Sequence, residues 1–264
     1  MTNQANKNAR EIWRKKCDQV ALEMKGHTRP FIMPLSIENE SDVRHVGTGS
    51  IINWAGKNLL LTCKHVQAEG AINFSFYGSE NVLATVPPFN TDVALDAAFV
   101  EIGAKQWNAF QHQAILIPES RIATQHKPGQ GEELLFFHGF AGENSHYAFG
   151  VLDSGASAYV TQQSAEAEDD NKIFELLWEP EETEYIESTS AEVRQAMRFM
   201  DPGGFSGSLV WNTRYLEVTS AGEPWTPECA EVTGLLKRWD TGTKTLLVSK
   251  VEHLRAYLAV AAQI

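Results

Sequence analysis

Three short segments carry side chains that could together perform nucleophilic acyl transfer. They are Thr62 to His65, Asp96 to Ile102 and Gly203 to Val210, in this order along the chain. A serine hydroxyl becomes a strong nucleophile when a histidine takes its proton, and a buried carboxylate holds that histidine in the required tautomer. His65, Asp96 and Ser206 supply one candidate for each of these roles.

The proposed nucleophile, Ser206, lies between two glycines. Gly204 and Gly207 permit a tight backbone, and the N–H groups of Gly204 and Ser206 could point to one spot and stabilise a developing oxyanion. Read alone, this segment could also be an ordinary loop. A strand-like run, Ser208 to Trp211, follows it, so we expect the serine to lie on a loop that enters a β-sheet.

The proposed base and its carboxylate flank apolar runs. His65 follows Leu59 to Leu61, so we expect it where a buried strand ends and a side chain can face a cleft. Asp96 opens a strand that continues with apolar residues, and its carboxylate could be buried against His65. Asp92 is the alternative. We favour Asp96, because starting the strand at Asp92 would place the charge of Asp96 within its apolar run.

Composition excludes several classes of protein. The chain has 264 residues and a formal net charge of −12, whereas nucleic acid-binding surfaces concentrate Lys and Arg. No apolar stretch is long enough for a bilayer, and the first thirty residues lack the apolar region of a secretory signal. Three scattered cysteines, Cys17, Cys63 and Cys229, indicate a reduced protein. We therefore expect a cytoplasmic protein that binds neither nucleic acid nor membrane.

The periodicity predicts an all-β protein with a helix at each end. Residues 8–25 and the stretch after Ser249 have helical spacing, with Ser249 and Glu252 placed as a capping box. Many short strands lie between them, which is typical of two packed antiparallel β-barrels. We expect an N-terminal helical extension over 1–28, a first β-barrel over 29–120 with His65 and Asp96, and a second over 121–264 with Ser206 and the C-terminal helix.

Acidic residues gather in the second half. Between Glu166 and Glu192 the chain has eleven Asp or Glu and a single Lys. The pattern predicts an exposed insertion of the second barrel that is held by apolar anchors, Ile173, Phe174, Leu176, Leu177 and Trp178. A solvated surface is the simpler interpretation, and a docking site for a regulatory protein partner is the alternative.

The motifs together resemble the trypsin/chymotrypsin-like serine proteases, especially the bacterial V8-like and HtrA-like branches. Gly47 to Ile52 resembles the Gly-x-Gly-x-hydrophobic strand of the family, Leu61 to Val66 its Leu-Thr-x-x-His-Val motif, Asp96 to Val100 its Asp-x-Ala motif, and Gly204 to Ser208 its Gly-x-Ser-Gly motif. The resemblance covers residues 31–262. It implies two packed six-stranded antiparallel β-barrels, a catalytic triad of His65, Asp96 and Ser206, an oxyanion hole at Gly204 and Ser206, and a protein or peptide substrate cleaved without cofactor or metal.

The resemblance also implies where a substrate would bind. Met200 would lie near the base of the specificity pocket, Leu236 would belong to the strand that lines the cleft, and Lys237 and Arg238 would flank the entrance. Two positions depart from the family. Phe205 replaces the Asp or Asn that is common before the nucleophile, which makes activation by a freed N-terminus unlikely. Lys237 falls where a small polar residue often lies beside the catalytic Asp.

Other interpretations remain open. Leu134 to Phe140, with His138 and Gly139, resembles the oxyanion strand of the α/β-hydrolases, and Ser206, Asp240 and His253 follow in the order of that fold. The elbow pattern Gly-x-Ser-x-Gly is broken by Ser208, however. A catalytically silent trypsin-like fold that binds a peptide or partner is a second alternative. We expect Cys63 to be a buried packing thiol that points away from His65 and takes no part in the chemistry.

Overall fold

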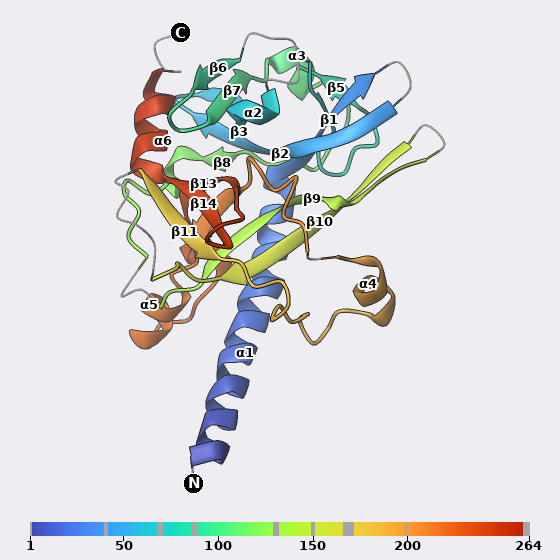
Figure 1. Cartoon of the computed structure of the whole chain (residues 1–264). Coiled ribbons are helices and arrows are strands. Elements are labelled where there is room, and N and C mark those ends of the chain that lie inside the picture. The colour runs from blue at the N-terminus through green and yellow to red at the C-terminus, as the bar shows by residue number, and fades with distance from the viewer. Residues whose placement is uncertain are drawn as a thin grey trace.

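The computed structural model describes residues 2–39, 42–67, 71–85, 89–128, 132–148, 151–165, 172–198 and 200–260. Most of its regular structure is β, arranged as two sheets that lie one above the other in Figure 1. The expected all-β architecture of two antiparallel halves with a helix at each end is therefore confirmed.

The first sheet contains more strands than expected. Its strands are β1 (Ile32–Asn39), β2 (Asp42–Trp54), β3 (Lys57–Cys63), β4 (Asn73–Phe74), β5 (Leu83–Ala84), β6 (Asn90–Asp92), β7 (Ala97–Glu101) and β8 (Ile117–Pro118). They run in the order β5-β4-β1-β2-β3-β7-β6, with β8 paired to β2 in parallel. Eight strands are found instead of six, because strands of two or three residues are too short to show an alternating pattern.

The second sheet has six antiparallel strands, as expected. They are β9 (Leu135–Ala148), β10 (Val151–Thr161), β11 (Ile173–Leu177), β12 (Leu209–Asn212), β13 (Glu231–Asp240) and β14 (Thr245–Lys250). Their order is β10-β9-β12-β13-β14-β11. An α/β-hydrolase is built on a mainly parallel sheet, so this arrangement excludes the α/β-hydrolase interpretation.

Part of the acidic segment is a strand of this sheet and not an insertion. β11 pairs with β14, and Phe174, Leu176 and Trp178 are buried. Of the other two expected anchors, Ile173 is half-buried, and Leu177 points outward and is 37% exposed. Residues 166–171, the most acidic part of the segment, lie outside the described residues.

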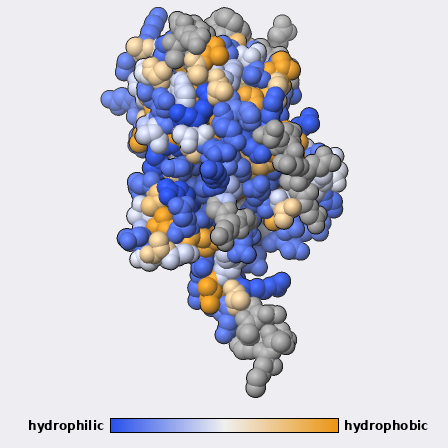
Figure 2. Space-filling model, turned by 90° about the vertical axis from the view of Figure 1, so that its left-hand side faces the viewer, coloured by the Kyte–Doolittle hydropathy of each residue, from blue (hydrophilic) through white to orange (hydrophobic). Residues whose placement is uncertain are grey.

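The helices are α1 (Thr2–Thr28), α2 (Lys64–Gln67), α3 (Ala104–Trp107), α4 (Ala191–Ala196), α5 (Tyr215–Ser220) and α6 (Val251–Leu258), with 3-10 turns at Arg29–Phe31, Glu119–Arg121 and Pro227–Cys229. The N-terminal half of α1 projects well beyond both sheets in Figure 1, while Val20 and Met24 near its other end are buried. The surface in Figure 2 is mostly hydrophilic, with scattered apolar patches. None of the helices in the described ranges combines the length and apolar character needed to cross a bilayer.

The capping box expected at the start of α6 does not form. Lys250 is the N-cap residue, and no side chain caps the helix. Ser249 donates its hydroxyl proton to the carbonyl oxygen of Leu95 at 2.9 Å, and the Glu252 carboxylate accepts from the backbone N–H of His126 at 2.9 Å. Both side chains therefore tie α6 to other parts of the chain instead of to each other.

Candidate active site

His65 and Asp96 meet because two neighbouring strands place them there. β3 pairs antiparallel with β7, and Cys63 lies opposite Ala97, so the residue before β7 faces the turn after β3. The Nδ1 atom of His65 is 2.7 Å from Oδ2 of Asp96, and the backbone N–H of His65 donates to Oδ1 at 3.1 Å. Asp96 has a φ of 52°, a left-handed conformation that is uncommon outside glycine and is concentrated at functional sites.

The rival carboxylate, Asp92, has a different task. Its Oδ1 accepts a hydrogen bond from the backbone N–H of Leu95 at 2.9 Å and so caps the turn that leads into Asp96. Of the two candidates, Asp96 is the one that contacts His65. Asp92 shapes the turn that holds Asp96 in its left-handed conformation.

The environment of Asp96 keeps its carboxylate ionised. Partial burial favours the protonated acid, but hydrogen bonds and attraction from His65 outweigh this effect, and the nearby Lys237 ammonium adds to them. The net result is a pKa of Asp96 below its ordinary value. An ionised carboxylate that accepts from Nδ1 would leave Nε2 of His65 as the acceptor, which is the tautomer that a general base needs.

Ser206 lies on a loop whose glycines have no room for a side chain. Gly204 and Gly207 have φ values of 99° and 94°, which other residues rarely adopt. A Cβ atom on Gly204 would lie 2.7 Å from the carbonyl oxygen of Phe140 and 2.9 Å from the His45 ring. A Cβ atom on Gly207 would collide with the carbonyl oxygen of Thr48. The sequence Gly-Phe-Ser-Gly is therefore a packed turn and not a generic loop.

Strand β2 of the first sheet holds this loop in place. The backbone N–H of Thr48 donates to the Ser206 carbonyl oxygen, and the Thr48 hydroxyl donates to the Gly204 carbonyl oxygen, both at 2.9 Å. The Thr48 hydroxyl also accepts from the backbone N–H of Phe140 at 2.9 Å. One buried threonine thus links β2, β9 and the serine loop. The sequence signal was present in the Gly47 to Ile52 motif, but it did not reveal the role of this hydroxyl.

Phe205 anchors the loop from the other side. It is fully buried, and its ring makes edge contacts with Phe137, Tyr159 and Trp178 at centroid distances of 5.3, 5.4 and 6.4 Å. These rings belong to the apolar core of the second sheet. At the position where the proteases that this sequence resembles often have an Asp or Asn, this chain therefore has an aromatic anchor.

Two peptide groups orient the expected oxyanion-binding N–H groups. The Gly203 carbonyl oxygen accepts from the Gly142 N–H at 2.6 Å, and the Phe205 carbonyl oxygen accepts from the Ser208 N–H at 2.9 Å. In a trans peptide the following N–H points the opposite way. The N–H groups of Gly204 and Ser206 are therefore directed away from Gly142 and Ser208.

The Ser206 hydroxyl donates to the backbone carbonyl oxygen of Lys237 at 2.8 Å. Within the described ranges, no hydrogen bond joins it to His65. The two halves of the site are nevertheless adjacent: a Cβ atom on Gly207 would lie 3.1 Å from Cα of Thr62, three residues before His65. Hydrogen bonds of catalytic groups are often long or misdirected in ligand-free structures.

A register shift in β13 determines where the side chain of Lys237 points. The pairing with β14 slips between Leu236 and Arg238, and a bulge of this kind re-aims the side chain of the extra residue. Lys237 is only 8% exposed, and its ammonium donates to the carbonyl oxygen of Ala94 at 3.4 Å. Its side chain therefore lies beside the Asp96 turn, as the resemblance implies. The expectation that it flanks a pocket entrance is wrong.

The other expected substrate-binding residues are dispersed. Met200 is 59% exposed, which does not fit the base of a pocket. Leu236 is buried in the core of the second sheet, and only its backbone reaches the loop, where its carbonyl oxygen accepts from the Gly207 N–H. Arg238 is exposed at the surface. Of the four, Arg238 alone keeps an exposed side chain on the strand that follows the site.

Cys63 is fully buried, as expected, but it does not point away from the site. Its thiol donates to the Leu236 carbonyl oxygen at 3.2 Å, and burial raises the pKa of the thiol well above its ordinary value. The Sγ atom and the ligand atoms of His65 and Asp96 all lie within 4.8 Å of one another. No metal ligands are expected from the sequence, because it contains neither a His-Glu-x-x-His motif nor a paired cysteine motif.

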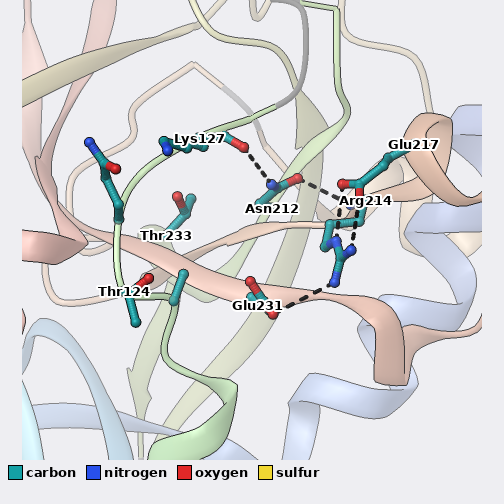
Figure 3. A pocket seen from close by; sticks show the side chains of 9 residues that line it. Thr124, Lys127, Asn212, Arg214, Glu217, Glu231 and Thr233 are labelled. Atoms are coloured by element: carbon teal, nitrogen blue, oxygen red, sulfur yellow. Dashed lines mark hydrogen bonds and ion pairs between the residues drawn. The ribbon is translucent and has the colours of Figure 1, made fainter.

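A separate hollow of about 240 Å³ lies between the second sheet and α5 (Figure 3). Arg214 lies there beside two carboxylates, with Glu217 at 2.7 Å and Glu231 at 3.6 Å. Asn212 donates to the Lys127 carbonyl oxygen at 3.3 Å and accepts from the Arg214 N–H at 3.1 Å. Arg214, Glu217, Glu231 and Asn212 are thus engaged within this hollow, and its lining does not include His65, Asp96 or Ser206.

Comparison with known proteins gives a fold and no close relative. No family model matches the sequence, and no curated protein matches it. Among solved structures, the serine endoprotease from Yersinia pestis is 14% identical and superposes with a TM-score of 0.51 over 92% of this chain and 66% of that one. The inactive form of the Rv3671c protease from M. tuberculosis is 13% identical, with a TM-score of 0.50 over 91% of this chain and 93% of that one. The two sheets, with a paired His and Asp on one and a glycine-bounded Ser on the other, have the chymotrypsin-like serine protease fold.

Proposed function

We propose that this protein is a serine endopeptidase that uses His65, Asp96 and Ser206. The observation that carries the proposal is the 2.7 Å pair of His65 with Asp96, next to a Ser206 loop that hydrogen bonds from the same sheet hold in place. The pair would prepare the base, and the loop would present both the nucleophile and two backbone N–H donors.

In the proposed reaction, Nε2 of His65 takes the proton of Ser206 while Oγ attacks the carbonyl carbon of a peptide bond. The N–H groups of Gly204 and Ser206 stabilise the oxyanion. His65 then gives its proton to the leaving amine, which leaves an acyl-enzyme on Ser206. Water, deprotonated by the same histidine, releases the acid and restores the hydroxyl. The first step requires Ser206 to rotate its hydroxyl from the Lys237 carbonyl oxygen toward His65.

Covalent labelling with a fluorophosphonate probe tests the proposal. The wild-type protein should be labelled at Ser206 and should cleave an unfolded protein substrate, while Ser206→Ala should lose both activities, with turnover falling by roughly 10⁴ to 10⁶. Ser208→Ala is the matched control. The Ser208 hydroxyl is buried and has no hydrogen-bond partner in the described part of the chain, so the Ser208→Ala variant should still be labelled at Ser206.

A catalytically silent, peptide-binding protein is the second candidate. The hydrogen bond from Ser206 to Lys237 favours this candidate, because the hydroxyl donates to a backbone carbonyl oxygen and not to His65. A silent protein would not be labelled by the probe, and Ser206→Ala would bind peptides as tightly as wild type. Labelling of Ser206 at a rate that depends on His65 would exclude it.

A further inference from the structure

Three side chains at the proposed active site carry atoms of the kinds that bind metal ions in proteins. The thiol of Cys63, a ring nitrogen of His65 and a carboxylate oxygen of Asp96 lie within 4.8 Å of one another. The cause is the pairing of β3 with β7: Cys63 ends one strand opposite Ala97, Asp96 precedes Ala97, and His65 lies two residues beyond Cys63. These are three different donor types brought together from two chain segments.

This donor set selects particular ions. A thiolate, an imidazole and a carboxylate suit borderline-soft ions such as Zn²⁺ and Cd²⁺ and do not suit Mg²⁺ or Ca²⁺. Ligand atoms at about 2.0 to 2.3 Å from a zinc ion lie at most about 4.6 Å apart. A small movement of one side chain would therefore bring all three ligand atoms within bonding distance of a single ion. The His65 side chain, which is 49% exposed, has room to move, whereas Cys63 is fixed in the core.

We propose that Cys63, His65 and Asp96 form an inhibitory site for Zn²⁺ or a similar soft divalent cation. Binding would release the thiol proton to water, would shift the proton of His65 from Nδ1 to Nε2, and would exchange the hydrogen bond between Nδ1 and Asp96 for one bond from each residue to the metal. His65 would then be unable to act as a base. The half-exposed face of His65 leaves the fourth coordination position open to water.

The inhibitory effect rests on the proposed function, but the binding site does not. Cadmium binding can be followed without any activity, because a thiolate bound to Cd²⁺ absorbs in the ultraviolet. The chain has three cysteines, so the starting protein is the double variant Cys17→Ser and Cys229→Ser, in which Cys63 is the remaining thiol. Circular dichroism should first confirm that this variant folds as wild type does.

Titration of the double variant with CdCl₂ should produce the absorption band with a stoichiometry of one, and ZnCl₂ should abolish it by competition. Asp96→Asn and His65→Ala should each weaken binding at least tenfold, and Cys63→Ala should give no band. Cys63→Ser serves as a second variant if the alanine form does not fold. No band at millimolar Cd²⁺, or unchanged affinity in both Asp96→Asn and His65→Ala, would overturn the site.

Probe labelling of Ser206 gives the second readout. Zn²⁺ should inhibit labelling of the wild-type protein, and Cys63→Ala should require at least tenfold more Zn²⁺ for the same inhibition. Equal sensitivity of both proteins would show that the metal acts elsewhere and would overturn the proposal. If Ser206 is never labelled, the proposed protease function fails, and the cadmium titration still decides whether the site exists.

Discussion

Ser206 and Lys237 contact each other through the nucleophile's hydroxyl and a backbone carbonyl oxygen, at 2.8 Å. The same lysine reaches across to the Asp96 turn with its ammonium group, which donates to the Ala94 carbonyl oxygen at 3.4 Å. Lys237, the bulged residue of β13, thus contacts Ser206 through its backbone carbonyl group and the Asp96 turn through its ammonium group.

The charge of Lys237 should contribute to the lower pH limit of the reaction. Hydrogen bonds and attraction from His65 hold the pKa of Asp96 below its ordinary value, and the Lys237 ammonium adds to them, so its removal should let that pKa rise and should ease protonation of the site. In Lys237→Met, the pH of half-maximal probe labelling should therefore move upward. Lys237→Arg keeps the charge and should leave the profile close to wild type. An unmoved profile in Lys237→Met would contradict the prediction.

The two carboxylates near His65 should differ sharply on substitution. Asp96→Asn should lower the labelling rate by roughly 10⁴ at neutral pH, because an amide can hold His65 in the wrong tautomer. Asp92→Asn should be far milder, since that side chain accepts one backbone N–H in a turn. Labelling rates of both variants, measured alongside circular dichroism, test the difference. Equal losses would mean that the turn and not the charge of Asp96 matters.

Thr48 should position the serine loop. Thr48→Val keeps the shape but removes the bonds to the Gly204 carbonyl oxygen and from the Phe140 N–H. We expect a stability loss of roughly 1 to 3 kcal/mol and a fall in labelling of roughly 10- to 100-fold. Thr213→Val is the control. That residue is also fully buried and hydrogen-bonded, but its hydroxyl donates to Leu134 and Glu133 and accepts from the Tyr215 N–H, away from the serine loop. It should lose stability without a comparable loss of labelling.

His138 should make the fold sensitive to acid. Burial lowers its pKa from 6.5 to about 3, so the folded protein keeps this ring neutral where the unfolded chain takes up a proton. Stability from this residue is complete above pH 6.5 and falls as the pH drops toward 3. Between pH 7 and pH 5 the loss should be about 2 kcal/mol. Urea unfolding of wild type and His138→Phe at both values should show a smaller loss in the variant.

Only part of this site could be predicted from the sequence. His65, Asp96 and Ser206 were predicted as candidate site residues because each lies in a short motif next to an apolar run. The position of Lys237 was predicted only in part. Its side chain lies beside Asp96, as the resemblance implies, but it does not flank a pocket entrance, because a bulge breaks the alternation from which a side chain's direction is inferred. The role of Thr48 was missed, because its hydroxyl contacts Gly204, which is 156 residues away in the chain.

The same reasoning applies to the fold. Long strands such as β2 and β9 have enough alternating residues to be recognised, whereas β4, β5 and β8 have two residues each and form only through their neighbours. β11 was interpreted in part as an anchor for an insertion because its surroundings are acidic. The run Ile173 to Trp178 was nevertheless predicted to be a strand of the second half, and its pairing with β14 and the burial of Phe174, Leu176 and Trp178 confirm that strand.

The burial of Phe205 has a consequence for how the chain must be produced. The packing that shapes the serine loop is also packing that stabilises the second sheet, so the loop takes its shape as that sheet folds. If the proposed activity needs no later step than this, a host cell that expresses the wild-type chain would be exposed to it from the first folded molecule. Yields of Ser206→Ala should then exceed those of wild type.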